Sequence, residues 1–142
     1  MPKNKLYVDS SAIIIGIEKR ESNSALLLEL IAAKRLQPYT SEKTLREVNS
    51  YFSAHGTERE AYFVQQLVRR EFTIVPLEKI MPQIRKWRGR IKEKDLEHLA
   101  TAKALRLPFI VAFERDFRTF KEYRTPKQFL QGLVIKHLET EY

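Results

Sequence analysis

The sequence of 142 residues contains no cysteine, three histidines and four glycines. The lack of cysteine excludes disulfide bonds, zinc–thiolate sites and a cysteine nucleophile. The three histidines, His55, His98 and His137, are too few for a histidine-rich zinc site. Neither GxGxxG nor GxxxxGK(S/T) occurs, so the common glycine-rich loops that bind phosphate are missing. A metal site in this chain would have to rely on oxygen ligands.

Long hydrophobic runs are missing as well. Apolar runs such as residues 12–15 and 25–28 fall far short of the roughly 18 residues that a transmembrane helix needs. Residues 1–8 are too short and too polar for a signal peptide. Since the length fits one domain, we expect a single domain over residues 1–142, located in the cytoplasm and without membrane contact.

The charge balance is strongly basic. Lys and Arg number 26 against 18 Asp and Glu, which gives a net charge of +8, and such a balance favours an anionic partner such as nucleic acid. Most of the excess lies in residues 79–94, where Glu93 is the one acid among seven basic residues: Lys79, Arg85, Lys86, Arg88, Arg90, Lys92 and Lys94. A smaller basic group follows later, with Arg115, Arg118, Lys121, Arg124 and Lys127.

Short apolar segments alternate with helical periodicity along the chain. Strands are expected at residues 6–8, 72–75 and 108–112, with a brief extended segment at 36–40 that Pro38 breaks. Helices are expected at 12–19, 23–35, from about 41 to Gly56, after Thr57, at 82–91, 94–107 and 126–130. This alternation predicts an α/β sandwich with a mostly parallel sheet, in which sites form beyond the carboxyl ends of the strands.

Five acidic residues fall at positions where they could converge. Asp9 follows the first strand, Glu47 lies on a helix away from its apolar stripe, and Asp95 opens the helix before the last strong strand. Glu114 and Asp116 follow that strand. Each of the first three has an ordinary alternative: Asp9 as a helix N-cap, Asp95 as a first-turn acid favoured by the helix dipole, and Glu47 as a solvated side chain.

Five segments together resemble one known family. They are residues 6–11 (LYVDSS), 41–48 (SEKTLREV), 95–102 (DLEHLATA), 110–117 (IVAFERDF) and 125–130 (TPKQFL). In this order they resemble the PIN-domain nucleases, and most of all the VapC-type toxins of toxin–antitoxin pairs. The resemblance implies a three-layer α/β/α sandwich, an RNA substrate, a protein antitoxin as partner, and commonly a homodimer.

The resemblance also implies a site built from carboxylates. Asp9, Glu47 and Asp95 match the three invariant acids of the family. At the fourth place Ala112 stands where the family often has threonine, Glu114 takes the place of the acid, and Asp116 with Phe117 matches the ending. We therefore expect Asp9, Glu47, Asp95 and Glu114 as the catalytic acids, with Asp116 as a further candidate metal ligand.

The chemistry of phosphodiester hydrolysis agrees with such a composition. Paired Mg²⁺ or Mn²⁺ ions activate a water molecule and stabilise the leaving oxygen, and these hard ions prefer carboxylate oxygens. Contacts to substrate are expected from seven residues near the acids: Ser11, Arg88, Arg90, Lys92, Lys94, His98 and Arg115. For His98 a buried, hydrogen-bonded position beside an acid is an equally good interpretation.

Two other interpretations remain to be compared. A PIN-like domain without nuclease activity, which binds RNA or a protein, is favoured by the altered segment from Ala112 to Asp116. A phospho-acceptor receiver domain needs an aspartate at the end of its middle strand, and residues 72–76 end without one. The apolar faces at residues 26–36 and 62–68 are either interfaces or core, and Trp87 is expected in the core or an interface rather than as a platform for base stacking.

Overall fold

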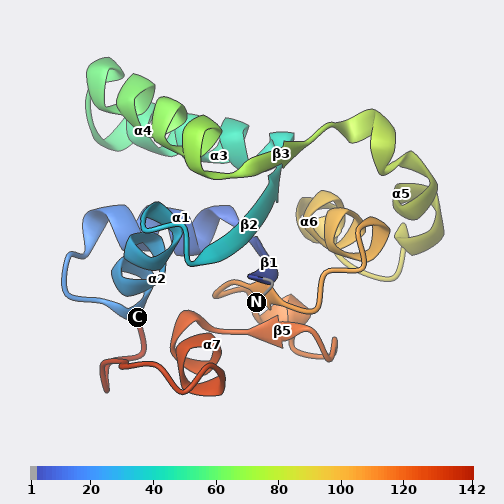
Figure 1. The fold of residues 1–142 in the computed structure, drawn as a ribbon. Coiled ribbons are helices and arrows are strands. Elements are labelled where there is room, and N and C mark those ends of the chain that lie inside the picture. Colours follow the sequence, from blue (N-terminus) through green and yellow to red (C-terminus); the bar gives the residue numbers. More distant parts are fainter. Residues whose placement is uncertain (1–2) are drawn as a thin grey trace.

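The computed structural model describes residues 3–142, and its centre is a sheet of five parallel strands (Figure 1). The strands are β1 (Asn4–Val8), β2 (Leu36–Ser41), β3 (Thr73–Val75), β4 (Ile110–Val111) and β5 (Tyr123–Arg124). Their order across the sheet is β3-β2-β1-β4-β5, so the first strand of the chain lies in the middle. Neighbouring parallel strands need crossover connections, which the helices supply.

Strand β1 is buried on both faces, and its residues alternate between two cores. Leu6 and Val8 pack on one face of the sheet, and Tyr7 packs on the other. In register, Tyr7 lies beside Tyr39 of β2 and Ile110 of β4. The sheet is therefore covered on both sides, as an all-parallel sheet requires.

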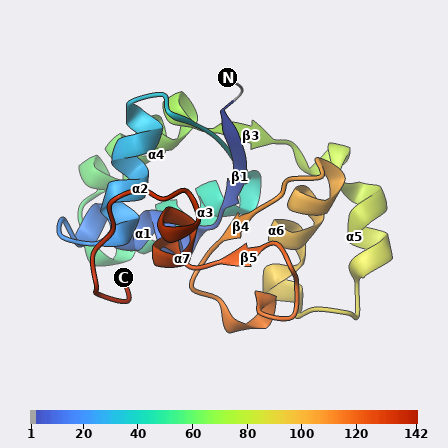
Figure 2. The same cartoon turned by 60° about the horizontal axis from the view of Figure 1, so that its bottom comes forward.

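Seven α-helices of the described chain form the outer layers. They are α1 (Ser10–Glu18), α2 (Asn23–Ala32), α3 (Glu42–His55), α4 (Glu58–Glu71), α5 (Met81–Trp87), α6 (Glu93–Ala104) and α7 (Pro126–Gly132). Helices α5 and α6 cover one face of the sheet, and α1, α2 and α7 lie on the other (Figures 1 and 2). Helices α3 and α4 pack against each other and join the core of the second group. The expected three-layer α/β/α sandwich is confirmed.

Three local predictions differ from the structure. The helix expected at residues 82–91 ends at Trp87, because Gly89 has a positive φ of 86° that continues a turn rather than a helix. Strand β2 runs through Pro38, which is tolerated because β3 pairs only with residues from Tyr39 onward. Strand β5 was not predicted, since two residues carry no periodic signal.

Two helix starts follow their predicted signals. Ser41 caps α3 by accepting a hydrogen bond from the backbone N–H of Thr44, although Thr44 has no side chain that can complete a capping box. Thr57 caps α4 in the same way. Between residues 3 and 142 the structure has no helix that is both long and apolar enough to cross a bilayer.

Candidate functional site

Asp9 is fixed at the junction between β1 and α1. Its carboxylate Oδ1 accepts hydrogen bonds from the hydroxyl of Ser11 at 2.6 Å and from the backbone N–H of Ala12 at 3.3 Å, which caps α1. The side chain of Ser11 also accepts a bond from the backbone N–H of Phe113, in the loop after β4. Ser11 therefore links Asp9 to the loop that carries Glu114, and its position does not require a contact with substrate.

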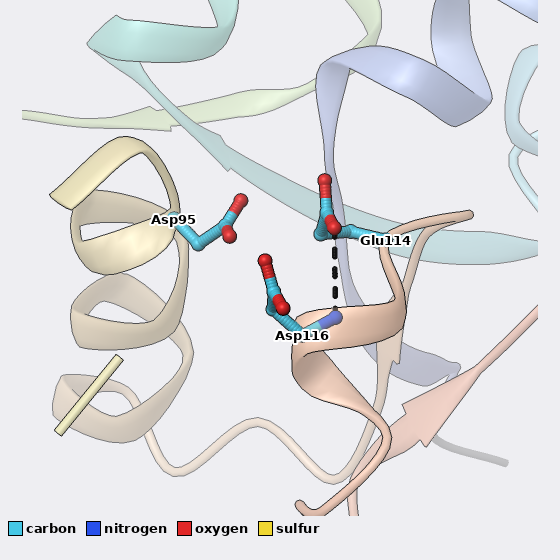
Figure 3. Close-up of side chains that lie close together, drawn as sticks. All are labelled: Asp95, Glu114 and Asp116. Atoms are coloured by element: carbon cyan, nitrogen blue, oxygen red, sulfur yellow. Dashed lines mark hydrogen bonds between the residues drawn. The ribbon is translucent and has the colours of Figure 1, made fainter. Parts of the chain in front are cut away.

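Asp95, Glu114 and Asp116 form the one group of acids in residues 3–142 whose carboxylate oxygens come close enough to hold a common ion. One oxygen of each lies within 4.8 Å of the others. Figure 3 shows Asp95 pointing from the first turn of α6 toward the two acids that follow β4. The backbone N–H of Asp116 donates to Glu114 Oε1 at 3.5 Å, which orders this loop. We call these three residues the acidic group.

Two oxygens of the acidic group have no hydrogen-bond partner. Asp95 Oδ2 and Asp116 Oδ2 are buried and accept no hydrogen bond from the described residues. Burying a carboxylate oxygen without a hydrogen bond costs free energy, and the ammoniums of Lys94 and Lys92, 3.3 and 3.4 Å from these atoms, offset part of that cost. A divalent cation with oxygen ligands is the kind of group that would satisfy both atoms.

The ammonium of Lys94 lies against all three members of the acidic group. Its Nζ is 2.6 Å from Glu114 Oε2, 3.3 Å from Asp95 Oδ2 and 3.7 Å from Asp116 Oδ2. Lys92 makes a further ion pair with Asp116 at 3.4 Å. These two lysines supply positive charge from the end of the basic segment, directly beside the acids.

Glu47 lies outside the acidic group and is held by two other residues. Its Oε1 accepts hydrogen bonds from His98 Nε2 at 2.8 Å and from the hydroxyl of Ser10 at 3.1 Å. Burial works against ionisation of Glu47, but these two donors outweigh it and hold its pKa below the usual range. Its charge in turn raises the pKa of Asp9 slightly, so the two acids lie within electrostatic range of each other.

The other acids differ in their preferred protonation. Burial raises the pKa of Asp9, which is 4% exposed. Burial and the nearby charge of Glu114 raise the pKa of Asp95. Partial burial of Asp116 is outweighed by the Lys92 ammonium, which lowers its pKa. The site thus mixes carboxylates that resist ionisation with others that favour it, as in sites where a cation completes the charge balance.

The remaining predicted contact residues have different surroundings. Arg88 pairs with Glu93, the Arg90 guanidinium lies over the ring of Trp87, and Arg115 is exposed in the turn after Glu114. His98 is only 2% exposed and uses both ring nitrogens inside the protein, so it contacts an acid rather than the surface. Trp87 packs edge to face on Phe120, which agrees with a role in packing.

Three residues near Glu47 were not singled out from the sequence. The hydroxyl of Tyr7 bonds to His98 Nδ1 at 2.5 Å, to Ser41 at 2.9 Å and to Thr44 at 3.3 Å. The sequence gives one hint of this cluster, which is the tyrosine in an otherwise aliphatic strand. A buried tyrosine hydroxyl needs a polar partner. The identity of that partner depends on tertiary contacts that spacing does not reveal.

Comparison with known proteins assigns this arrangement to a family. The model of the PIN domain matches residues 6–123, which include Asp9, Glu47 and all three members of the acidic group. The chain belongs to the PIN domain family. Sequence comparison with curated proteins gave no match.

Solved structures of similar fold include several from toxin–antitoxin systems. A toxin–antitoxin complex from Klebsiella pneumoniae has 22% identity and a TM-score of 0.67, covering 85% of this chain and 97% of that chain. VapBC2 from Rickettsia felis, bound to promoter DNA, has 16% identity and a TM-score of 0.69, covering 85% and 98%. VapC20 from Mycobacterium tuberculosis, a toxin that cleaves the sarcin–ricin loop, has 17% identity and a TM-score of 0.60, covering 80% and 93%. At these identities the likeness concerns the PIN fold.

Proposed function

We propose that this PIN-domain protein is a metal-dependent endoribonuclease that hydrolyses phosphodiester bonds in RNA. The observation that carries the proposal is the acidic group with its two buried oxygens, Asp95 Oδ2 and Asp116 Oδ2, which accept no hydrogen bond from the described residues. It lies where α6 begins and β4 ends, the edge of a parallel sheet at which ligands bind. An oxygen-only ligand set of this kind suits Mg²⁺ or Mn²⁺.

The acids have distinct parts in this proposal. Asp95, Glu114 and Asp116 would hold the metal, and Asp9 and Glu47 would complete the site from the start of α1 and from α3. A bound divalent ion supplies an activated water and stabilises the leaving oxygen. Both Glu114 and Asp116 belong to the acidic group, so we assign the fourth ligand position to the pair rather than to one of them.

The basic residues next to the acids would bind the RNA backbone. Lys92 and Lys94 contact the acidic group directly. Arg88 and Arg90 precede them in the basic segment and Arg115 follows Glu114, and all three are exposed. Positive charge beside a carboxylate site draws in a polyanion and offsets repulsion between phosphate and acids. Such contacts carry no sequence information, so they support binding to RNA in general.

We further propose that the protein is the toxin of a toxin–antitoxin pair and forms a homodimer. Its structural neighbours are toxin–antitoxin complexes. Of the two apolar faces predicted from the sequence, Leu27, Ile31 and Leu36 are buried in the core. On the other face, Tyr62 and Phe63 of α4 are each 67% exposed, and this aromatic pair is our candidate for contact with a protein partner.

A second function, binding without cleavage, has one observation in its favour. The ammonium of Lys94 already offsets part of the negative charge of the acidic group without a metal, and the protein could bind RNA in that state. A metal-dependence assay separates the two functions.

The assay incubates purified protein with single-stranded RNA in Mn²⁺, in Mg²⁺ and in EDTA. We expect cleavage only with metal, with products that lack a 2′,3′-cyclic phosphate, because water rather than the ribose hydroxyl attacks. Asp95→Asn is expected to abolish cleavage. Glu93→Gln, an exposed acid on the same helix that pairs with Arg88, is the matched control. Cleavage in EDTA, or full activity of Asp95→Asn, would contradict the proposal.

A further inference from the structure

A chain of buried polar side chains leads from the middle of the sheet to Glu47. Tyr7 of β1, Ser41 at the end of β2, Thr44 of α3 and His98 of α6 are each at most 2% exposed. Their side chains are joined by hydrogen bonds through the Tyr7 hydroxyl, and His98 continues the chain to Glu47. Four elements of the fold are thus tied to one carboxylate.

The hydrogen-bond acceptors among these side chains determine which group donates in each bond. An ionised carboxylate only accepts hydrogen bonds, so His98 Nε2 must be the donor to Glu47 Oε1. In a neutral imidazole the other nitrogen, Nδ1, then accepts, and the Tyr7 hydroxyl 2.5 Å away donates to it. The oxygen of Tyr7 is left to accept from Ser41, whose own oxygen accepts from the backbone N–H of Thr44.

The hydrogen bonds to Glu47 occupy one of its two carboxylate oxygens. Ser10 and His98 both donate to Oε1, and among the described residues nothing donates to Oε2. The side chain is 38% exposed and would otherwise rotate freely in solvent. The two neighbouring serines bond to different acids, since Ser10 donates to Glu47 and Ser11 donates to Asp9.

His98 also connects Glu47 to the acidic group through α6. It lies three residues after Asp95 in the same helix, so one rigid element carries both an acid and the group that orients another acid. Hydrogen bonds to a ligand's free or distal atoms fix ligand orientation in metal sites, and their loss typically weakens metal binding 10- to 100-fold.

We propose that His98, itself oriented by Tyr7, is a positioning residue that holds Glu47 with Oε2 directed to the metal site. The inference rests on the proposed function, because it assigns His98 a task in that same site. From the sequence, His98 was expected to contact substrate; in this inference it contacts an acid, Glu47, instead.

The first test measures Mn²⁺ binding by calorimetry, without RNA. We expect His98→Leu and Tyr7→Phe each to weaken binding about tenfold, and His98→Gln to recover most of the loss, because its amide can still donate to Glu47. Thr101→Val is the matched control: Thr101 is buried on the same helix, and within residues 3–142 its hydroxyl bonds only to the backbone of Glu97. Circular dichroism melting verifies that every variant is folded.

A double-mutant cycle separates positioning from a general structural effect. In a Glu47→Gln background His98→Leu should have little further effect on Mn²⁺ binding, because the residue it positions has lost its charge. The inference is overturned if His98→Leu weakens binding equally in both backgrounds, or if Thr101→Val weakens it as much.

Nitrogen-15 NMR of the histidine rings gives a readout that needs neither metal nor RNA. We expect the proton of His98 on Nε2 in the wild type and in Tyr7→Phe, since Glu47 still accepts it, and a mixture of tautomers in Glu47→Leu, which removes that acceptor. A proton on Nδ1 in the wild type would overturn the inference. If the wild type binds no Mn²⁺, the proposed function fails, and the NMR result then decides alone whether Tyr7 and His98 form the directed chain to Glu47.

Discussion

Replacing Lys94 with methionine removes the ammonium from the acidic group and keeps most of the aliphatic side chain. In the wild type this ammonium contacts Glu114 at 2.6 Å, and Asp95 and Asp116 at longer distances. The contact with Glu114 raises the pKa of Lys94 above its usual value, so the charged form of the lysine is favoured. A divalent cation entering the acidic group must compete with it.

The size of the effect follows from the exposure of the lysine. Its side chain is 54% exposed, and a single ion pair at such a position contributes about 0.2–1 kcal/mol. With three carboxylates around one ammonium, we take the total as about 1.4 kcal/mol, which corresponds to a tenfold change in an equilibrium constant. We therefore expect Lys94→Met to bind Mn²⁺ about tenfold more tightly and to melt about 3–5 °C lower without metal.

The assay combines titration calorimetry with Mn²⁺ and thermal melting in EDTA. Lys94→Arg keeps the charge and should resemble the wild type. Lys92→Met removes a cation that pairs with one member of the acidic group, Asp116, at 3.4 Å, so its effect should be smaller. Saturating Mn²⁺ should remove the difference in melting temperature between Lys94→Met and the wild type. Unchanged or weaker Mn²⁺ binding by Lys94→Met would refute the competition.

Four further predictions concern other sites. Asp95→Asn should keep or raise the melting temperature without metal, because burial and Glu114 disfavour its charge; a clear fall in melting temperature would make Asp95 a structural residue. Folding raises the pKa of Asp9, so its ionised form destabilises the fold above that pKa, and the cost disappears as the pH falls through it. Asp9→Asn, which keeps the helix cap, should therefore melt higher than the wild type near pH 7, with a gain that shrinks toward acid pH; a gain independent of pH would contradict this. Arg90→Gln with Lys92→Gln should lower the salt dependence of RNA binding by about 0.7 in slope for each phosphate that is no longer neutralised, and an unchanged slope would place the RNA elsewhere. Gly16→Ala should cost about 1–3 kcal/mol in unfolding free energy, because its Cβ would meet the backbone oxygen of Ser24 at 2.9 Å, and chemical denaturation measures the loss.

The fold could be predicted well wherever a segment had its own periodic signal. Helices α3 and α4 begin at the predicted caps, Ser41 and Thr57, and the aliphatic strand before Asp9 is found as β1. The sequence could not locate β5, because Tyr123 and Arg124 become a strand only by pairing with β4. Local propensity does not contain that pairing.

The candidate site was predictable in composition but only partly in geometry. The rule that sites form at the carboxyl ends of parallel strands drew attention to Asp9 and Glu114, and the structure groups Glu114 with Asp95 and Asp116. The separate support of Glu47 by His98 and Ser10 depends on where three helices meet. Spacing along one helix predicts which residues share a face, but not which side chain of another helix lies opposite.

The central place of β1 in the sheet has a consequence for the newly made protein. This strand is made before the other four strands, yet one of its two neighbours, β4, is synthesised much later than β1. A nascent chain already carries Asp9 and Glu47 before Asp95, Glu114 and Asp116 have been added. Strands β1 and β4 lie far apart in the sequence, and pairing between such distant segments slows folding. The order of residues along the chain thus keeps the set of acids incomplete until nearly the whole domain has left the exit tunnel.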